Sequence, residues 1–179
     1  EIQSITMSMR MIPLEGLFNK MKRLVRDLSR KMDKPVQFFI SGADTEMDRN
    51  VIEEIADPLV HIIRNAIDHG LENPADRKAA RKNPVGVVDL NARYEGNEIW
   101  ITVSDDGAGL KKERIVKNAL EKGLIKGDPD AMEPKDIWKL IFEPGFSTVD
   151  KVSEISGRGV GMDVVKRNIE KLRGNIDIK

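Results

Sequence analysis

The sequence contains no cysteine among its 179 residues, which excludes a disulfide framework, a thiolate zinc site and a cysteine nucleophile. It also lacks net charge, because 30 basic and 30 acidic residues cancel and leave no overall field that attracts nucleic acid or an anionic membrane. No apolar run approaches the ~20 residues needed to cross a bilayer, and no signal peptide opens the chain. We therefore expect a cytoplasmic protein that neither binds nucleic acid nor inserts into a membrane.

The residues that are present fit a folded domain. Charged residues make up 34% and hydrophobic residues 40% of the chain, and the length suits one compact domain. Apolar residues at helical spacing predict helices over residues 13–28 and 49–71, and we expect Pro58 to kink the second helix or to restart it after Asp57.

Further along, the pattern predicts strands and helices in turn. The predicted strands cover residues 36–40, 87–94 and 98–104, with the last two joined as a hairpin, and a further strand begins at 175–178. Helices are predicted over residues 115–120 and 164–172. Between them, residues 123–158 contain several glycines and prolines and one short helix, which is typical of a functional lid. Strands flanked by helices indicate an α/β or α+β fold.

The helix over residues 49–71 carries a polar face. His61, Asn65 and His69 follow at intervals of four residues and therefore line one side. The Asn65 amide offers a hard oxygen to Mg²⁺, whereas imidazole is not a typical Mg²⁺ ligand. A solvated polar stripe and a His–Asn hydrogen bond are the alternatives.

Asp105 directly follows the strand predicted over residues 98–104. Continued period-two alternation puts its side chain on the same side as Ile101 and Val103. We expect that side to be buried, and a buried carboxylate needs hydrogen-bond donors. A purine amino group is one such donor, and an internal backbone cap is the alternative. Gly107 and Gly109, in the Asp-x-Gly-x-Gly turn, permit a positive φ angle and close approach to a flat ligand.

A third element, Gly157-Arg158-Gly159-Val160-Gly161, leads directly into a helix. Glycines at a helix N-terminus present backbone N–H groups and the positive end of the helix dipole to phosphate. The spacing matches neither a Walker loop nor a dinucleotide-binding fingerprint. A flexible hinge is the alternative to a phosphate site.

The order of these elements resembles the GHKL ATPase superfamily, which includes gyrase B, the heat-shock chaperone ninety, MutL and the sensor histidine kinases. Three longer stretches resemble one branch, the chemotaxis histidine kinases of the CheA family: DPLVHIIRNAIDHG at 57–70, FEPGFST at 142–148 and SGRGVGMDVV at 156–165. The resemblance covers nearly the whole chain from about residue 11.

This resemblance implies an α/β (α+β) two-layer sandwich of the Bergerat type, with a mixed sheet covered by helices on one face. It implies binding of ATP and Mg²⁺ and transfer of the γ-phosphoryl group to a histidine on a separate phosphoacceptor domain. The alternative is a GHKL-type ATPase or a nucleotide-gated interaction module without kinase activity.

Matched residue by residue, the resemblance makes His61, Arg64 and Asn65 catalytic and gives Asn65 and His69 to Mg²⁺. His61 holds the place of a water-activating Glu in GHKL ATPases. The nucleotide-binding residues that it implies are Asn65, Asp68, His69, Asp105, Gly107, Gly109, Arg114, Ser147, Thr148, Gly157, Arg158, Gly159, Val160, Gly161 and Met162.

The resemblance also implies a domain plan and partners. Residues 1–11 would end a dimerisation helix or linker and residues 12–179 would form the kinase domain, truncated before a Gly-Thr loop. The whole protein would be a homodimer in which the phosphoacceptor domain is served in trans, with a coupling adaptor and chemoreceptors bound by other domains. Arg81 stands where the family commonly has glycine, which is expected to affect a loop turn.

Overall fold

The computed structural model describes residues 10–146 and 161–179. The chain divides into two compact units, Glu1–Gly107 and Ala108–Lys179, here called the N-terminal and the C-terminal unit. Among the described residues, no helix has the length and apolar character needed to cross a membrane. The residues expected to end a dimerisation helix, up to Met9, lie outside the described ranges.

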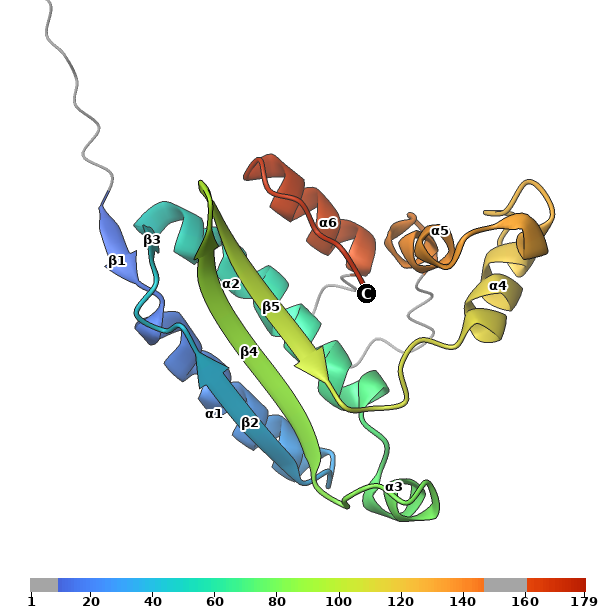
Figure 1. Ribbon diagram of the computed structural model, residues 1–179, viewed down its shortest axis with the longest axis horizontal. Helices are drawn as coiled ribbons and strands as arrows, with labels where there is room; N and C mark the ends of the chain where they lie inside the picture. Colours follow the sequence, from blue (N-terminus) through green and yellow to red (C-terminus); the bar gives the residue numbers. More distant parts are fainter. Residues whose placement is uncertain (1–9, 147–160) are drawn as a thin grey trace, which may run out of the picture. The chain divides into compact units, whose positions relative to one another are not determined.

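The N-terminal unit has two layers, a mixed three-stranded sheet and the helices that cover one of its faces (Figure 1). Strand β2 (Val36–Ser41) runs parallel to β4 (Gly86–Glu95), and β4 runs antiparallel to β5 (Glu98–Asp105). The covering helices are α1 (Glu15–Lys31) and α2 (Arg49–Asn65). The mixed sheet covered on one face is the predicted fold class, which is thereby confirmed.

Smaller elements complete this unit. They are the paired strands β1 (Met11–Pro13) and β3 (Glu46–Asp48), the π-helix η1 (Ala66–Gly70) and helix α3 (Pro74–Ala79). Strand β1 spans the predicted domain boundary between residues 11 and 12, and this boundary stays a prediction.

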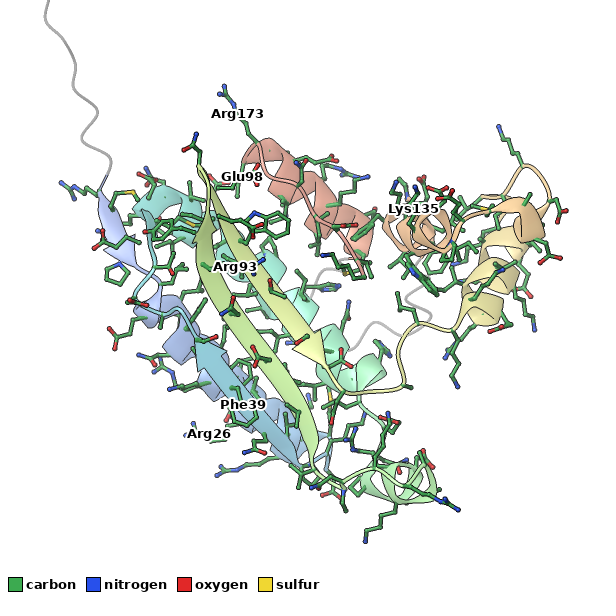
Figure 2. The ribbon with its side chains drawn as sticks, viewed as in Figure 1. Arg26, Phe39, Arg93, Glu98, Lys135 and Arg173 are labelled. Carbon is green, nitrogen blue, oxygen red and sulfur yellow. The ribbon has the colours of Figure 1, made fainter. Side chains whose placement is uncertain are left out.

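Alternation along the strands decides which face of the sheet is covered. On β4, Val88, Leu90 and Ala92 are buried, and they pair with Asp105, Val103 and Ile101 of β5 on the same side. The opposite face carries Phe39 and Arg93, which Figure 2 labels on the uncovered side of the sheet. The predicted hairpin is confirmed, because the pairing of Glu95 with Glu98 leaves a two-residue turn.

Helix α2 is less interrupted than the sequence predicts, and it ends at Asn65 rather than at the predicted residue 71, because the chain continues there as the π-helix η1. It begins after Asp48, whose carboxylate accepts hydrogen bonds from the backbone N–H groups of Asn50 and Val51. Pro58 lies inside the helix and is buried, and Asp57 is helical rather than a cap, so the predicted restart of the helix is wrong. Proline removes only its own N–H from the ladder, and burial of the Pro58 ring in the core compensates for that loss.

Four helices end in the same local motif, in which one residue adopts a left-handed conformation. After α3 the residue is Arg81 (φ 59°): Arg81 N–H donates to the Lys78 carbonyl, and Lys82 N–H donates to the Arg77 carbonyl. These two bonds define a Schellman motif, where glycine is the usual residue. The other left-handed residues of this kind are Asp33 after α1, Gly123 after α4 and Arg173 after α6.

The C-terminal unit is helical in its described residues. Its helices are α4 (Lys112–Glu121), η2 (Pro129–Ala131), α5 (Pro134–Lys139), η3 (Leu140–Phe142) and α6 (Met162–Lys171). A small core of Ile115, Ala119, Ile137 and Leu140 holds α4 and α5 together. The described part of the predicted irregular segment is thus more regular than expected. Residues 175–178 form no strand, because a strand requires a paired neighbour and none exists within the described ranges.

Candidate functional site

Asp105 is exposed at the end of β5, contrary to the prediction that it is buried. The predicted parity is correct, since Asp105 shares its side with Val103, but the strand ends there and no side chain covers it. Gly70 faces the carboxylate: a Cβ atom on Gly70 would lie 3.1 Å from both oxygens. The absence of a side chain at position 70 therefore keeps the Asp105 carboxylate accessible.

One carboxylate oxygen of Asp105 has an internal donor. The backbone N–H of Gly107 donates to Asp105 Oδ1 at 2.9 Å, which is the backbone cap considered above as the alternative. The second oxygen, Oδ2, accepts no hydrogen bond within the described residues and is available to an external donor.

Gly107 is required by close approach rather than by its φ angle. A Cβ atom there would lie 2.0 Å from the Gly70 carbonyl oxygen and 2.7 Å from Asp105 Oδ1, distances that no side chain can occupy. The predicted positive φ is found instead at Gly109 (φ 70°), in the C-terminal unit. Within the N-terminal unit, Gly70, Asp105 and Gly107 therefore form one closely packed corner.

The polar face of α2 continues into the π-helix η1. His61, Arg64 and Asn65 are half-buried, whereas Asp68 and His69 are exposed, with Asp68 Oδ2 and His69 Nε2 3.6 Å apart. Burial lowers the pKa of His61, and the charges of Arg64 and His69 lower this pKa further. His61 is therefore neutral at neutral pH, and the effect of His69 on it agrees with the predicted shared face.

Lys34 anchors the π-helix, a role that no sequence pattern indicates. Its ammonium group donates to the carbonyl oxygens of Ile67 (2.9 Å), Asp68 (2.6 Å) and Leu71 (2.8 Å). The last carbonyls of a helix have no hydrogen-bond partner within the helix, and Lys34 supplies a donor to them. Its positive charge also complements the negative end of the helix dipole. Lys34 thus fixes the segment that carries His69 and Gly70.

A second group of cations holds the turn after Asp105. The Arg77 side chain, only 1% exposed, donates from Nη2 to Asp106 Oδ2 at 2.8 Å and from Nη1 to Glu72 Oε1 at 3.2 Å. Lys82 Nζ donates to Glu72 Oε2 (2.8 Å), to the Asp106 carbonyl (3.1 Å) and to the Gly107 carbonyl (2.8 Å). We call these five residues the Arg77–Lys82 network.

The two carboxylates of this network, Glu72 and Asp106, both have lowered pKa values. The hydrogen bond from Lys82 lowers the pKa of Glu72. Burial raises the pKa of Asp106, but the hydrogen bonds from Val87 N–H and from Arg77 outweigh that effect and lower the pKa overall. The even spacing of Glu72, Arg77 and Lys82 does not reveal burial, so no sequence pattern predicts this network.

The predicted residues of the C-terminal unit are only partly described. Gly109 and Arg114 are exposed, Gly161 is the N-cap of α6, and Met162 is the first residue of that helix. The predicted phosphate-binding residues Ser147, Thr148, Gly157, Arg158, Gly159 and Val160 lie outside the described ranges.

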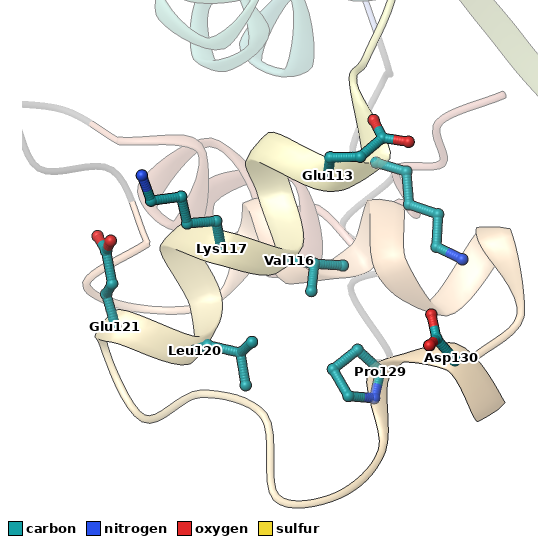
Figure 3. Close-up of a pocket in the computed structure, with 8 residues that line it drawn as sticks. Glu113, Val116, Lys117, Leu120, Glu121, Pro129 and Asp130 are labelled. Atoms are coloured by element: carbon teal, nitrogen blue, oxygen red, sulfur yellow. The ribbon is translucent and has the colours of Figure 1, made fainter.

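A hollow of about 470 Å³ in the C-terminal unit contains none of the predicted site residues (Figure 3). Figure 3 shows that it opens between α4 and the segment around Pro129, with Val116 and Leu120 on its apolar side. No group of three or more His, Cys, Asp or Glu residues able to hold a metal ion exists within the described ranges.

Comparison with known proteins identifies the family. Residues 54–179 match the family described as histidine kinase-, DNA gyrase B-, and HSP90-like ATPase. The chain is 49% identical over its whole length to the chemotaxis protein CheA of Bacillus subtilis, covering 27% of that protein. It is 47% identical over its whole length to CheA of Salmonella typhimurium, covering 26% of it, and 50% identical over 99% of its length to the sensor histidine kinase CheAY of Helicobacter pylori, covering 22%.

The chain thus spans about a quarter of the length of these curated relatives. Among solved structures, the histidine kinase domain of the blue-light activated histidine kinase from Erythrobacter litoralis EL346 aligns with a TM-score of 0.45 and 19% identity, covering 57% of this chain and 45% of that one. These values are too low to support a common fold. From the sequence matches, the chain belongs to the family of histidine kinase-, DNA gyrase B- and HSP90-like ATPases and corresponds to the ATP-binding domain of the chemotaxis histidine kinases.

Proposed function

We propose that this domain binds ATP with Mg²⁺ and transfers the γ-phosphoryl group to a histidine on a separate phosphoacceptor domain in a chemotaxis signalling pathway. In this reaction an imidazole nitrogen of the acceptor forms a bond to phosphorus, the bond to the β-phosphate oxygen breaks, and ADP leaves. Such transfer depends chiefly on the positioning of the two reactants and on stabilisation of the phosphate charge. The residues that bind the nucleotide would therefore also provide the catalysis.

The observation that carries the proposal is the corner formed by Gly70, Asp105 and Gly107. An exposed carboxylate with one oxygen fixed by the Gly107 N–H and the other open fits the exocyclic amino group of adenine. Gly70 places no side chain against the carboxylate oxygens, and Gly107 can pack against the Gly70 carbonyl only because it has none. Asp105 would thereby select adenine.

Asn65 supplies the proposed protein ligand of Mg²⁺, with His69 as a second contact. Mg²⁺ keeps several water molecules and usually takes only one or two protein ligands together with the nucleotide phosphates. A site with one amide oxygen therefore suits a metal that arrives with the triphosphate. Asp68 would lie beside this metal, and Arg64 would supply positive charge to the phosphates.

The phosphates are assigned to residues of the C-terminal unit. Backbone N–H groups of Gly157, Gly159 and Gly161, followed by helix α6, would bind them as at other helix N-termini. Arg158, Val160, Met162, Arg114, Ser147 and Thr148 are the further nucleotide contacts proposed there, and Gly109 would pack beside the base.

His61 favours a kinase over an ATPase. The position that carries a water-activating Glu in related ATPases carries a half-buried imidazole here, and its lowered pKa keeps it neutral. A neutral imidazole has one acceptor nitrogen and no negative charge, so it supplies neither the charge nor the two acceptor oxygens with which a carboxylate orients water. Suppressed hydrolysis preserves ATP for the phosphoacceptor.

The remaining assignments concern the whole protein. We place it in the cytoplasm, where ATP is available, as a homodimer in which one subunit phosphorylates the other. Residues 1–11 would end the dimerisation helix, and the coupling adaptor and chemoreceptors would bind other domains.

Phosphotransfer tests the proposal directly. The protein is incubated with γ-labelled ATP, Mg²⁺ and a separately purified phosphoacceptor domain, and the label is located by its acid lability and by replacement of the acceptor histidine. We expect a labelled histidine on the acceptor and none on His61 or His69. ATP binding without any transfer would overturn the kinase assignment.

The alternative is an ATPase or a nucleotide-gated interaction module. It predicts steady hydrolysis without a phosphoacceptor, lost in His61→Ala, or a partner whose binding depends on ATP while no label is transferred. The kinase assignment predicts that His61→Glu raises acceptor-independent hydrolysis, since it restores the water-activating carboxylate.

A further inference from the structure

The turn that follows Asp105 is held by two cationic side chains, Lys82 and Arg77. Lys82 uses its three ammonium protons on Glu72, on the Asp106 carbonyl and on the Gly107 carbonyl. Arg77 holds the same turn through Asp106 Oδ2 and the Asp106 carbonyl. Two cations therefore bind two successive carbonyls of one turn.

Gly107 connects this network to the site. Its carbonyl accepts from Lys82, while its N–H donates to Asp105 Oδ1, so the orientation of this one residue sets both bonds. It also lies against the Gly70 carbonyl with no room for a side chain. A small rotation of the Gly107 backbone would therefore redirect the Asp105 carboxylate.

The network itself is rigid. Arg77 is buried, donates from Nε to the Asn83 carbonyl at 2.6 Å, and is anchored by Glu72, whose side chain is only 16% exposed. Asp106 is further tied to Val87 by hydrogen bonds in both directions. No buried side-chain polar atom within the described residues is left without a partner. Fully satisfied networks of this kind fix geometry rather than merely add stability.

We propose that Lys82, supported by Arg77 and Glu72, is a positioning residue that sets the adenine selectivity of Asp105 through the Gly107 backbone. The inference rests on the proposed function, because it requires Asp105 to accept from the adenine amino group. Lys82 itself contacts the Asp106 and Gly107 carbonyls, and in this proposal it acts on the nucleotide through Asp105.

The test compares two nucleotides in the intact protein. Dissociation constants for ATP and for purine riboside triphosphate, which lacks the 6-amino group, are measured by calorimetry with Mg²⁺. For the wild type we expect a preference for ATP of about tenfold or more, the value of one hydrogen bond to a charged group. The variant Lys82→Met keeps the length of the side chain and removes its donors, and we expect its preference to fall to about threefold or less.

Three controls isolate the positioning role. Lys78→Met makes the same change on an exposed residue of α3 whose side chain has no hydrogen bond or ion pair within the described ranges, and it should keep the wild-type preference. Lys82→Arg restores donors and should recover most of it. In an Asp105→Ala background, Lys82→Met should leave the ratio unchanged, since the two residues act as one unit.

The outcomes separate this inference from the proposed function. A wild type that does not bind ATP, or does not prefer it, overturns both. A wild type that prefers ATP, with Lys82→Met preferring it equally, overturns the inference alone and leaves Lys82 a structural residue. Should Lys82→Met fail to fold, Glu72→Gln weakens the same network and is judged by the same ratio.

Discussion

The two units of the chain use their charges in opposite ways. In the N-terminal unit, an almost fully buried Arg77 and a Glu72 that is 16% exposed form ion pairs around the turn after Asp105. In the described part of the C-terminal unit, the ion pairs connect exposed or partly exposed side chains near one another in sequence, such as Lys166 with Glu170 and Arg167 with Asp163. Removing one partner of a buried ion pair strongly destabilises the fold, whereas an exposed ion pair contributes little to the free energy of unfolding.

This difference indicates where a rigid geometry is built into the fold. The corner that we assign to adenine is fixed by satisfied polar groups in the N-terminal unit. The C-terminal unit relies on a small apolar core, and its described helices carry their charges at the surface. The chain offers a probe for each unit, because Trp100 lies in β5 and Trp138 in α5.

The largest effect is expected from Arg77→Met. The change leaves two carboxylates without their buried partner and should lower the unfolding free energy by about 3 kcal/mol. Urea denaturation followed by the fluorescence of Trp100, in a Trp138→Phe background, measures it. The matched change Arg167→Met in the C-terminal unit should cost within about 0.5 kcal/mol. Equal losses would contradict the comparison.

Acid should destabilise the N-terminal unit in a defined window. Glu72 and Asp106 have folded pKa values below their ordinary values of 4.5 and 3.8, so their contribution is complete above those values and is lost as the pH falls through the lower, folded values. His61 affects stability at a higher pH than these carboxylates. Because its pKa is lowered in the folded state, the unfolded chain binds the proton more readily, and stability falls as the pH drops below about 6.5.

Stability measured from pH 8 to pH 3 checks both parts of this expectation. The wild type should lose stability from about pH 6.5 downward, and His61→Gln should remove that first loss. Glu72→Gln should flatten the later loss, which remains smaller than that caused by Arg77→Met. A profile unaffected by either variant would show that these groups do not carry the pH dependence.

A smaller loss is expected from Ile137→Val in the core of the C-terminal unit. Ile137 is fully buried, and removal of one methylene group should cost about 1 kcal/mol. The fluorescence of Trp138 should report the loss in a Trp100→Phe background. In a Trp138→Phe background Trp100 reports on the N-terminal unit, and a loss of stability seen by Trp100 but not by Trp138 would contradict the division into two units.

The smallest effect is a gain from Arg81→Gly. Arg81 has φ 59° at the C-terminal end of α3, where glycine relieves backbone strain but loses more chain entropy on folding, so we expect a net stabilisation of about 0.5 kcal/mol. Gly123 occupies the equivalent position after α4 with φ 67°, and Gly123→Ala should destabilise by about 1 kcal/mol. Thermal melts of both variants give the signs, and a destabilised Arg81→Gly would contradict the strain argument.

Much of the fold could be predicted from periodicity. The alternation along β4 and β5 and the apolar face of α1 specify which side is buried, so these elements were predicted to within a few residues. The helix through Pro58 and the absent strand at 175–178 were not, because tertiary packing and strand pairing decide them. The importance of Arg81 was noticed from a departure in sequence, but its left-handed conformation is known only from the structure.

The site was predicted less completely than the fold. The residue types in the Asp-x-Gly-x-Gly turn made Asp105 and Gly107 candidate site residues. The exposure of Asp105, however, depends on Gly70, which lies 35 positions earlier in the sequence. The contacts that Lys34 and Lys82 make with backbone carbonyls join residues that are 24 to 37 positions apart. Carbonyls have no signature in a sequence, so no pattern could reveal these contacts.

A titration with Mg²⁺ and ATP tests the central claim most directly. The protein and its Asp105→Ala variant are compared by calorimetry, with melting curves to establish that both are folded. We predict saturable, adenine-selective binding to the wild type and a loss of about tenfold or more in affinity for the variant. Absence of binding to the folded wild type, or equal affinity in the two proteins, would contradict the assignment of this corner to the nucleotide.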